Sequence, residues 1–123
     1  MDKKWQQHLT PEQVNVCVNG GTEYPFSGQY NDFFEPGVYK CVCCQQKLFT
    51  SEQKFPSGCG WPAFSLAEKG SVKYVRDTSH NMERTEVRCS QCNAHLGHVF
   101  NDGPAPEFTR YCINSVCLIH EEQ

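Results

Sequence analysis

The sequence lacks an apolar run approaching the ~20 residues that a membrane-spanning helix needs. It also lacks an excess of positive charge: 11 basic side chains stand against 14 acidic ones, so no net positive field attracts a nucleic-acid backbone. The N-terminal segment from Met1 to His8 has no apolar stretch of the kind found in secretory signals. We therefore expect a soluble, cytoplasmic protein that binds neither nucleic acid nor membranes.

Cysteine, in contrast, is abundant. The chain of 123 residues has the length of one domain, and nine of its residues are cysteines. In a reducing compartment this composition favours metal binding or redox catalysis over a framework of disulfides. We expect a single domain over residues 1–123 that is monomeric, since it needs no partner to close a metal site.

Local patterns predict a mainly β protein. Thr10, Pro11 and Gln13 form a helix start with a capping box, and Asn19-Gly20-Gly21 ends that helix. One weak helical pattern runs from Ala63 to Glu68. Short segments rich in β-branched and aromatic residues predict strands at 38–42, 72–75, 85–89, 98–100 and 110–114. We expect two antiparallel sheets packed together, with short N-terminal helices.

Two Cys-x-x-Cys pairs, Cys41/Cys44 and Cys89/Cys92, have the spacing of zinc ligands. The 44 residues between the pairs mean that a shared ion would tie distant parts of the domain together. Four thiolates close the coordination shell, so we expect one structural zinc ion. Cys43 can replace one of its neighbours. The alternative, a dithiol of the thioredoxin type, is disfavoured because neither pair precedes a helical pattern.

Among the other cysteines, Cys112 and Cys59 have unusual surroundings. In a strand over 110–114, Arg110 and Asn114 share a face with Cys112, and a nearby cation favours the thiolate. Cys59 lies between two glycines, in a loop mobile enough to bring a second thiol into reach. On local sequence alone, a packed and unreactive Cys112 and an incidental Cys59 remain alternatives.

His95 and His98 are candidate proton donors near neutral pH. In an unbent strand they face opposite ways, so a shared site requires a bulge or bend at Gly97. Ordinary surface or core histidines, or metal ligands, are the alternatives. Trp61, in a Gly/Pro loop, either covers the core or offers an apolar wall to a methyl group.

The segments 57–64, 84–87, 95–104 and 110–115 resemble the signature blocks of the methionine-R-sulfoxide reductases of the B class, and 21–26 also fits. The resemblance covers nearly the whole chain. It implies two antiparallel sheets, a structural zinc ion in members with both cysteine pairs, and thioredoxin-dependent reduction of methionine R-sulfoxide, free or in oxidised proteins.

The same resemblance implies roles for individual residues. Cys112 matches the nucleophile, Cys59 the resolving cysteine, and Trp61 the residue that holds the substrate methyl group. The remaining expected site residues are the polar groups around the sulfoxide oxygen, His95, His98 and Asn114, and the substrate-binding residues Arg110, His80 and Phe100. Cys17, Cys43 and Cys117 do not belong to the family pattern.

The resulting hypothesis is a thiol cycle. The Cys112 thiolate attacks the sulfoxide sulfur, with His95 as the first choice of proton donor, and becomes a sulfenic acid. Cys59 then forms a disulfide with Cys112, which thioredoxin reduces. Two other functions remain open: a zinc-knuckle binding module, and a redox sensor that turns over no substrate.

Overall fold

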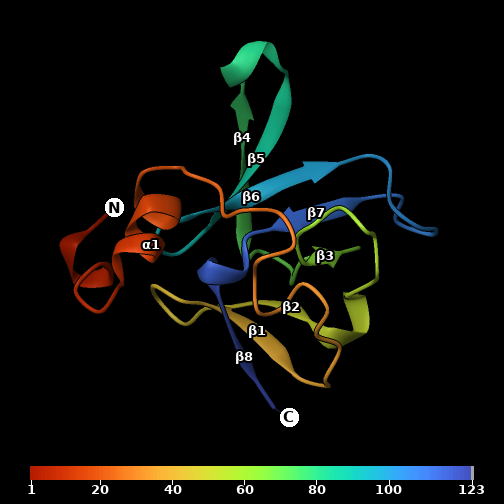
Figure 1. Ribbon diagram of the computed structural model, residues 1–123, viewed down its shortest axis with the longest axis horizontal. Helices are drawn as coiled ribbons and strands as arrows, with labels where there is room; N and C mark the ends of the chain where they lie inside the picture. The colour runs from red at the N-terminus through yellow and green to blue at the C-terminus, as the bar shows by residue number, and fades with distance from the viewer. Residues whose placement is uncertain (123) are drawn as a thin grey trace.

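Two antiparallel sheets frame the molecule in the computed structural model, which describes residues 1–122 (Figure 1). The expected domain extends to Gln123, which lies outside the described residues. A three-stranded sheet has the order β2-β1-β8, and a five-stranded sheet has the order β3-β7-β6-β5-β4. The strands are β1 (Val38–Cys41), β2 (Lys47–Thr50), β3 (Ala63–Phe64), β4 (Val72–Asp77), β5 (Arg84–Cys89), β6 (His95–Phe100), β7 (Arg110–Ile113) and β8 (Leu118–Glu121).

The helices are short and gather near the N-terminus, as predicted. In α1 (Pro11–Gln13) the Thr10 hydroxyl accepts from the Gln13 backbone N–H at 3.2 Å, and the Gln13 side chain accepts from the Thr10 N–H at 2.9 Å, which confirms the capping box. A π-helical turn, Val14–Val18, continues it and buries Cys17. Short 3-10 turns cover Lys3–Trp5, Ser51–Gln53, Ser79–Asn81 and Ser115–Cys117. No helix among residues 1–122 is long and apolar enough to cross a membrane.

The predicted strands all form, but the pattern from Ala63 to Glu68 does not give a helix, and that prediction is wrong. Ala63 and Phe64 form β3 and pair with Cys112 and Tyr111 of β7. The pairing partner lies far along the chain, so no local pattern reveals it. The short strands β2 and β8 were also missed; β8 pairs with the distant β1, whereas β2 forms a local hairpin with β1.

Aromatic side chains join the two sheets. Tyr39 of β1 and Phe49 of β2 meet Phe64 of β3, and all three are fully buried. The Phe49 and Phe64 rings stack with centroids 4.3 Å apart, while Tyr39 meets Phe64 edge-on at 5.0 Å. Such aromatic pairs stabilise a core beyond the area that they bury. The core therefore lies between the sheets and supports β3 and β7 on the side that faces the three-stranded sheet.

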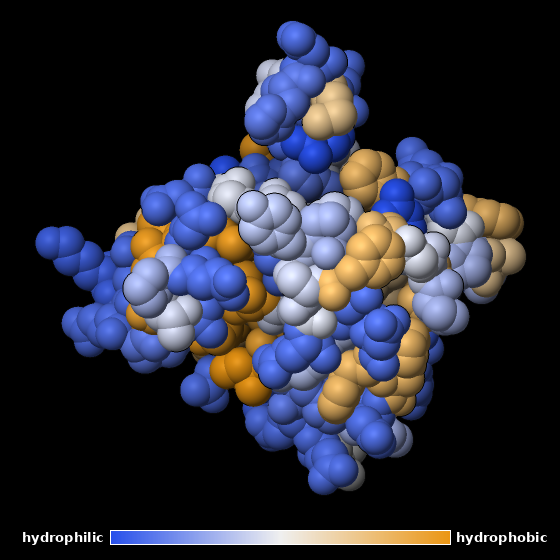
Figure 2. Space-filling view, viewed as in Figure 1, coloured by the Kyte–Doolittle hydropathy of each residue, from blue (hydrophilic) through white to orange (hydrophobic). Residues whose placement is uncertain are grey.

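The hairpin formed by β4 and β5 projects beyond the rest of the molecule (Figure 1). Its surface is mostly hydrophilic on the face seen in Figure 2. Lys73, Tyr74 and Arg76 are exposed along β4, since no further strand among residues 1–122 covers that edge of the sheet. One face of the hairpin is different, because on it Asp77 and Glu86 turn toward β6 and contact its histidines.

Candidate active site and metal centre

Two hairpin turns, one from each sheet, bring four cysteines together. The turn after β1 closes with a hydrogen bond of 2.8 Å from the Cys41 N–H to the Gln46 carbonyl. The turn after β5 repeats it, with 2.9 Å from the Cys89 N–H to the Ala94 carbonyl. A tight turn of this kind directs both thiols of a Cys-x-x-Cys pair to the same side.

The sulfur atoms of Cys41, Cys44, Cys89 and Cys92 all lie within 4.8 Å of one another. The nearest pairs are 3.6 Å (Cys41–Cys92) and 3.5 Å (Cys44–Cys89) apart. Zn–S bonds of ~2.3 Å in a tetrahedron separate the sulfurs by roughly 3.8 Å, so this group can hold one metal ion. Within the described part of the chain Cys43 is not a member of the group. The four predicted ligands thus come together from both sheets, and an ion held by them would tie one sheet to the other.

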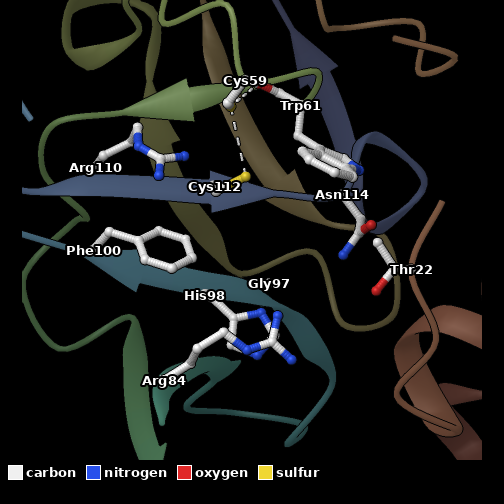
Figure 3. A pocket seen from close by; sticks show the side chains of 10 residues that line it. All are labelled: Thr22, Cys59, Trp61, Arg84, Gly97, His98, Phe100, Arg110, Cys112 and Asn114. Atoms are coloured by element: carbon white, nitrogen blue, oxygen red, sulfur yellow. Dashed lines mark hydrogen bonds between the residues drawn. The ribbon is translucent and has the colours of Figure 1, made fainter. Parts of the chain in front are cut away.

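A second pair of thiols faces one another across the end of β7. The Sγ atoms of Cys59 and Cys112 are 3.7 Å apart (Figure 3). The pairing of Ala63 with Cys112 holds the loop that carries Cys59 against β7. The Ser57 hydroxyl donates to the Cys59 sulfur at 3.0 Å. The loop cysteine and the strand cysteine are therefore close enough to form a disulfide after a small movement.

The two thiols titrate as a pair. A hydrogen bond from Cys112 lowers the pKa of Cys59 to about 5, with further help from Ser57 and the positive charge of Arg110. The same contact and burial raise the pKa of Cys112. The pair thus loses its first proton at a lowered pKa, because the remaining S–H stabilises the thiolate. It loses its second proton only at a raised pKa. At neutral pH the pair carries one negative charge and one shared proton.

Arg110 forms a wall of this site beside the thiol pair. Its guanidinium donates two hydrogen bonds to Asp102, of 2.8 Å from Nε and 3.2 Å from a terminal nitrogen. It also covers the Phe100 ring, with 4.5 Å between Cζ and the ring centroid. These contacts hold the cation in a fixed position, from which it favours a thiolate on Cys112.

A bulge in β6 brings the two histidines to one side of the sheet. Gly97 lies opposite Val87 but His95 lies opposite Arg88, so Leu96 is an extra residue in the pairing with β5. The His95 and His98 rings consequently approach to 5.7 Å between centroids. The bulge next to Gly97 that the sequence analysis required is therefore confirmed.

Each histidine is held by a carboxylate from the β4–β5 hairpin. His98 Nε2 lies 2.8 Å from Asp77 Oδ2, and hydrogen bonds from Ser79 and His98 lower the pKa of Asp77. His95 Nδ1 lies 2.6 Å from Glu86 Oε2. Burial raises the pKa of Glu86, but Arg88 and His95 lower it by more, so its carboxylate stays ionised.

Burial lowers the pKa of His95, although Glu86 opposes this effect. Its Nε2 is buried, and no described residue forms a hydrogen bond with it. With Nδ1–H donated to Glu86, the neutral ring presents a lone pair at Nε2. His95 thus acts as a hydrogen-bond acceptor in this arrangement rather than as a charged donor.

On the side of the site opposite Arg110, a chain of hydrogen bonds holds Trp61 and Asn114 in place. Trp61 Nε1 donates to the Glu23 carbonyl at 3.1 Å, and the Glu23 N–H donates to Asn114 Oδ1 at 3.0 Å. Asn114 Nδ2 in turn donates to the Leu96 carbonyl at 2.9 Å. The Trp61 ring is thereby fixed beside the thiol pair, and Asn114 keeps one N–H for a ligand.

These walls enclose a cavity of about 290 Å³, at the lower end of the range for ligand clefts. The structure brings seven of the predicted residues together around it: Cys59, Trp61, His98, Phe100, Arg110, Cys112 and Asn114. Thr22, Arg84 and Gly97 also line it and were not predicted as site residues. An apolar indole wall, a thiol pair and an imidazole facing one small cavity can bind a short side chain and carry out thiol chemistry on it.

Two predicted site residues lie outside this cavity. His95 lies behind His98, and His80 is exposed at the end of the β4–β5 hairpin; both line a neighbouring cavity that His98 also reaches. Sequence reasoning also missed Asp77 and Glu86, which hold the two imidazoles. Glu86 falls within the 84–87 segment of the resemblance, but nothing in the sequence gives either carboxylate a role, because carboxylates on a hairpin are common and only the sheet register turns these two toward β6.

Comparison with known proteins finds clear relatives of the chain. A family model described as the SelR domain matches residues 9–122. A protein of Pseudomonas syringae pv. syringae (strain B728a) named peptide methionine sulfoxide reductase MsrB is 58% identical over 117 residues, covering 94% of this chain and 89% of the relative. A protein of the same name from Pseudomonas putida (strain GB-1) is 56% identical over 116 residues, covering 94% and 88%.

A solved structure supports the fold alone. The crystal structure of the Mis18 'Yippee-like' domain superimposes with a TM-score of 0.58 at 22% identity, covering 72% of this chain and 98% of that one.

Proposed function

Since the chain belongs to the SelR domain family, the B class of methionine sulfoxide reductases, we propose that its paired thiols reduce methionine R-sulfoxide, free or in oxidised proteins, in a thiol cycle. The observation that carries this proposal is the Cys59–Cys112 pair, with sulfurs 3.7 Å apart in a cavity that Trp61 and His98 also line. The Trp61 ring offers the apolar contact that a thioether methyl group prefers. The cysteines, the imidazole and Asn114 supply the polar side.

In the first step the Cys112 sulfur attacks the sulfoxide sulfur. The shared proton of the thiol pair moves to Cys59, so that Cys112 reacts as the thiolate beside the Arg110 guanidinium. The sulfur–oxygen bond of the substrate breaks and the oxygen is transferred to Cys112, which becomes a sulfenic acid as methionine leaves. The methionine sulfur is reduced and the cysteine sulfur is oxidised by two electrons.

We assign the proton donor to His98 in place of His95. His98 lines the same cavity as Cys112, and its Nε2 contact with Asp77 leaves Nδ1 for proton exchange. His95 lies behind it with its proton engaged by Glu86, a position better suited to accepting a hydrogen bond from an intervening water. Asn114 then orients the sulfoxide oxygen through its remaining N–H.

In the second step the Cys59 thiol condenses with the sulfenic acid and releases water, which forms the Cys59–Cys112 disulfide. Thioredoxin then supplies two electrons and two protons, restores both thiols and leaves with its own disulfide. The loop glycines beside Cys59 allow the small approach that a sulfur–sulfur bond of ~2.05 Å requires.

The four-cysteine group holds a structural zinc ion in this proposal. Thiolate ligands in a closed tetrahedron favour zinc and leave no open position for catalysis. A reducing compartment such as the cytoplasm keeps these thiols available. The enzyme works as a monomeric single domain, since both cysteines of the cycle and all four ligands come from one chain.

Incubation with each epimer of a capped methionine sulfoxide tests the activity. We expect turnover of the R epimer with thioredoxin and none of the S epimer. Cys112→Ser should abolish methionine formation, whereas Cys59→Ser should form about one methionine per chain and then stall, because no disulfide reaches thioredoxin. A Cys112→Ser protein that retains activity would exclude Cys112 as the nucleophile.

A further inference from the structure

Three cysteines belong neither to the four-sulfur group nor to the proposed cycle: Cys17, Cys43 and Cys117. Two of them form a second close pair of thiols. The Cys17 thiol donates a hydrogen bond to the Cys117 sulfur at 3.3 Å, which is shorter than the 3.7 Å between the sulfurs of Cys59 and Cys112. Both side chains are buried. The chain therefore has a second pair of sulfurs that a small movement can join.

The second pair connects the N-terminal helices to the C-terminal part of the chain. Cys17 lies in the π-helical turn Val14–Val18, and Cys117 lies in the 3-10 turn Ser115–Cys117. The Cys117 thiol also donates to the His95 carbonyl at 3.2 Å, so it holds its turn against β6. Because neither cysteine lies in a strand, the two sulfurs can approach without breaking the pairing of either sheet.

A small cavity gives access to one of the two residues. It measures about 210 Å³, and Cys17 lines it whereas Cys117 does not. It reaches the surface beside Asn19 and Gly20, which are exposed. A water molecule takes up about 30 Å³ in the liquid, so this cavity has room for a small oxidant such as hydrogen peroxide. Cys17 is therefore the sulfur that an oxidant reaches first.

We propose that Cys17 and Cys117 form a second redox site, which hydrogen peroxide converts into a disulfide. The Cys17 sulfur attacks one peroxide oxygen, the oxygen–oxygen bond breaks, and Cys17 becomes a sulfenic acid as water leaves. The Cys117 thiol then condenses with the sulfenic acid, which forms the sulfur–sulfur bond and releases a second water. The two cysteines lose two electrons and the peroxide gains them. This oxidation needs neither the sulfoxide substrate nor the reductase cycle.

The second pair is less reactive than the first. The hydrogen bond with Cys117 and burial raise the pKa of Cys17, whereas Cys112 lowers the pKa of Cys59 to about 5. The thiolate is the form that attacks an oxidant, so peroxide oxidises Cys59 before Cys17. The second pair thus stays reduced until the oxidant persists, which is also the condition that turns methionine into its sulfoxide.

Cys43 is the competing partner for Cys17, because the two thiols are hydrogen-bonded. Cys43 lies between Cys41 and Cys44, two of the predicted metal ligands, in the turn after β1. It cannot move toward Cys17 without moving a ligand. Cys117 has no ligand beside it in the chain, so we assign the disulfide to Cys17 and Cys117.

The disulfide would give the fold a link that does not depend on the metal ion. The two cysteines are 100 positions apart, so their bond closes most of the chain into one loop. A cross-link restricts the unfolded chain more strongly when its loop is longer. It also anchors the turn that directly follows Asn114 to the N-terminal helices. The protein is thereby stabilised under conditions that can also oxidise its metal-binding thiolates.

Peptide mapping of the full-length protein tests the pairing. Hydrogen peroxide is added in steps, the remaining thiols are alkylated in denaturant, and unreduced peptides are identified by mass spectrometry. We expect a Cys59–Cys112 link at low doses and a Cys17–Cys117 link at higher doses, with Cys43 alkylated. Any result that leaves Cys17 unlinked to Cys117 in a large excess of peroxide, including a link to Cys43, overturns the proposal. Absence of the Cys59–Cys112 link alone would count against the proposed cycle and not against the second pair.

Thermal unfolding gives an independent measurement. Peroxide should raise the Tm of the wild-type protein by roughly 10 °C more than it raises that of Cys17→Ala, because only the wild type closes the long loop. Each protein is compared with its own reduced form, so a loss of packing in the variant cancels. Cys43→Ala is the matched control, since it removes a buried thiol from the same cluster and keeps the pair. It should respond as the wild type does. Equal responses of Cys17→Ala and the wild type would contradict the proposal.

Discussion

The two histidines of β6 are held by different carboxylates, His98 by Asp77 and His95 by Glu86. Only His98 lines the substrate cavity, so we expect the two to have different roles. We expect His98→Gln to lower the rate of the first turnover about 10²-fold or more, which is the usual contribution of a general acid. His95→Gln should lower it less, because His95 lies outside the substrate cavity. Rapid-quench measurement of methionine formed without reductant gives both rates. A larger loss in His95→Gln would return the donor role to that residue.

The shared proton of the thiol pair gives a second prediction at this scale. Because Cys112 lowers the pKa of Cys59 to about 5, alkylation by iodoacetamide should accelerate as the pH rises through that value. Alanine at either position removes the stabilising S–H without putting another donor in its place, so in both Cys59→Ala and Cys112→Ala the titration should move to higher pH. The pH dependence of the alkylation rate is the measurement. A single variant that still titrates near the low value would show that the proton is not shared.

At the scale of elements, the approach of β6 to β7 depends on Gly97. A Cβ at this position would collide with the carbonyl of Cys112, so Gly97→Ala must push the two strands apart. We expect a loss of about 1–3 kcal/mol in the free energy of unfolding. Activity should also fall, since Cys112 and His98 pair across these strands. Denaturant unfolding and steady-state assays measure the two effects, and an unchanged variant would mean that the strands tolerate separation.

Strand β6 also shows how much of the site can be predicted from the sequence. The sequence shows that His95 and His98 would face opposite ways in a regular strand, and so requires a bulge near Gly97. It does not show which histidine the bulge turns into the cavity, because that depends on the register with β5 and β7. Likewise, the pairing that makes a strand of Ala63 and Phe64 comes from β7 and not from their own residue types.

At the scale of the whole molecule, the four-cysteine group and the aromatic core both bring the two sheets together. Structural zinc contributes on the order of 10 kcal/mol, comparable to the total stability of a domain. We expect a strong chelator to abolish the cooperative thermal transition and added zinc to restore it, as measured by circular dichroism.

Two cysteine variants test which thiols bind the metal ion. Cys89→Ser should lose the bound metal and the thermal transition. Cys43→Ser should retain one zinc per chain by elemental analysis, because Cys43 lies outside the four-sulfur group. Loss of metal from Cys43→Ser alone would contradict the ligand assignment.

The sequence by itself determines the features that depend on nearby residues: the cysteine spacing that suits a metal ion, the capped N-terminal helix, the alternating strands, and the motifs that identify the family. Tertiary structure alone decides the parts that depend on register and approach. It turns His98 rather than His95 into the cavity, brings Asp77 and Glu86 against the two imidazoles, and places Cys59 beside Cys112. The physical reason is that ligand spacing and capping act over a few residues, whereas which atoms face one another across two sheets is fixed only when distant strands pair.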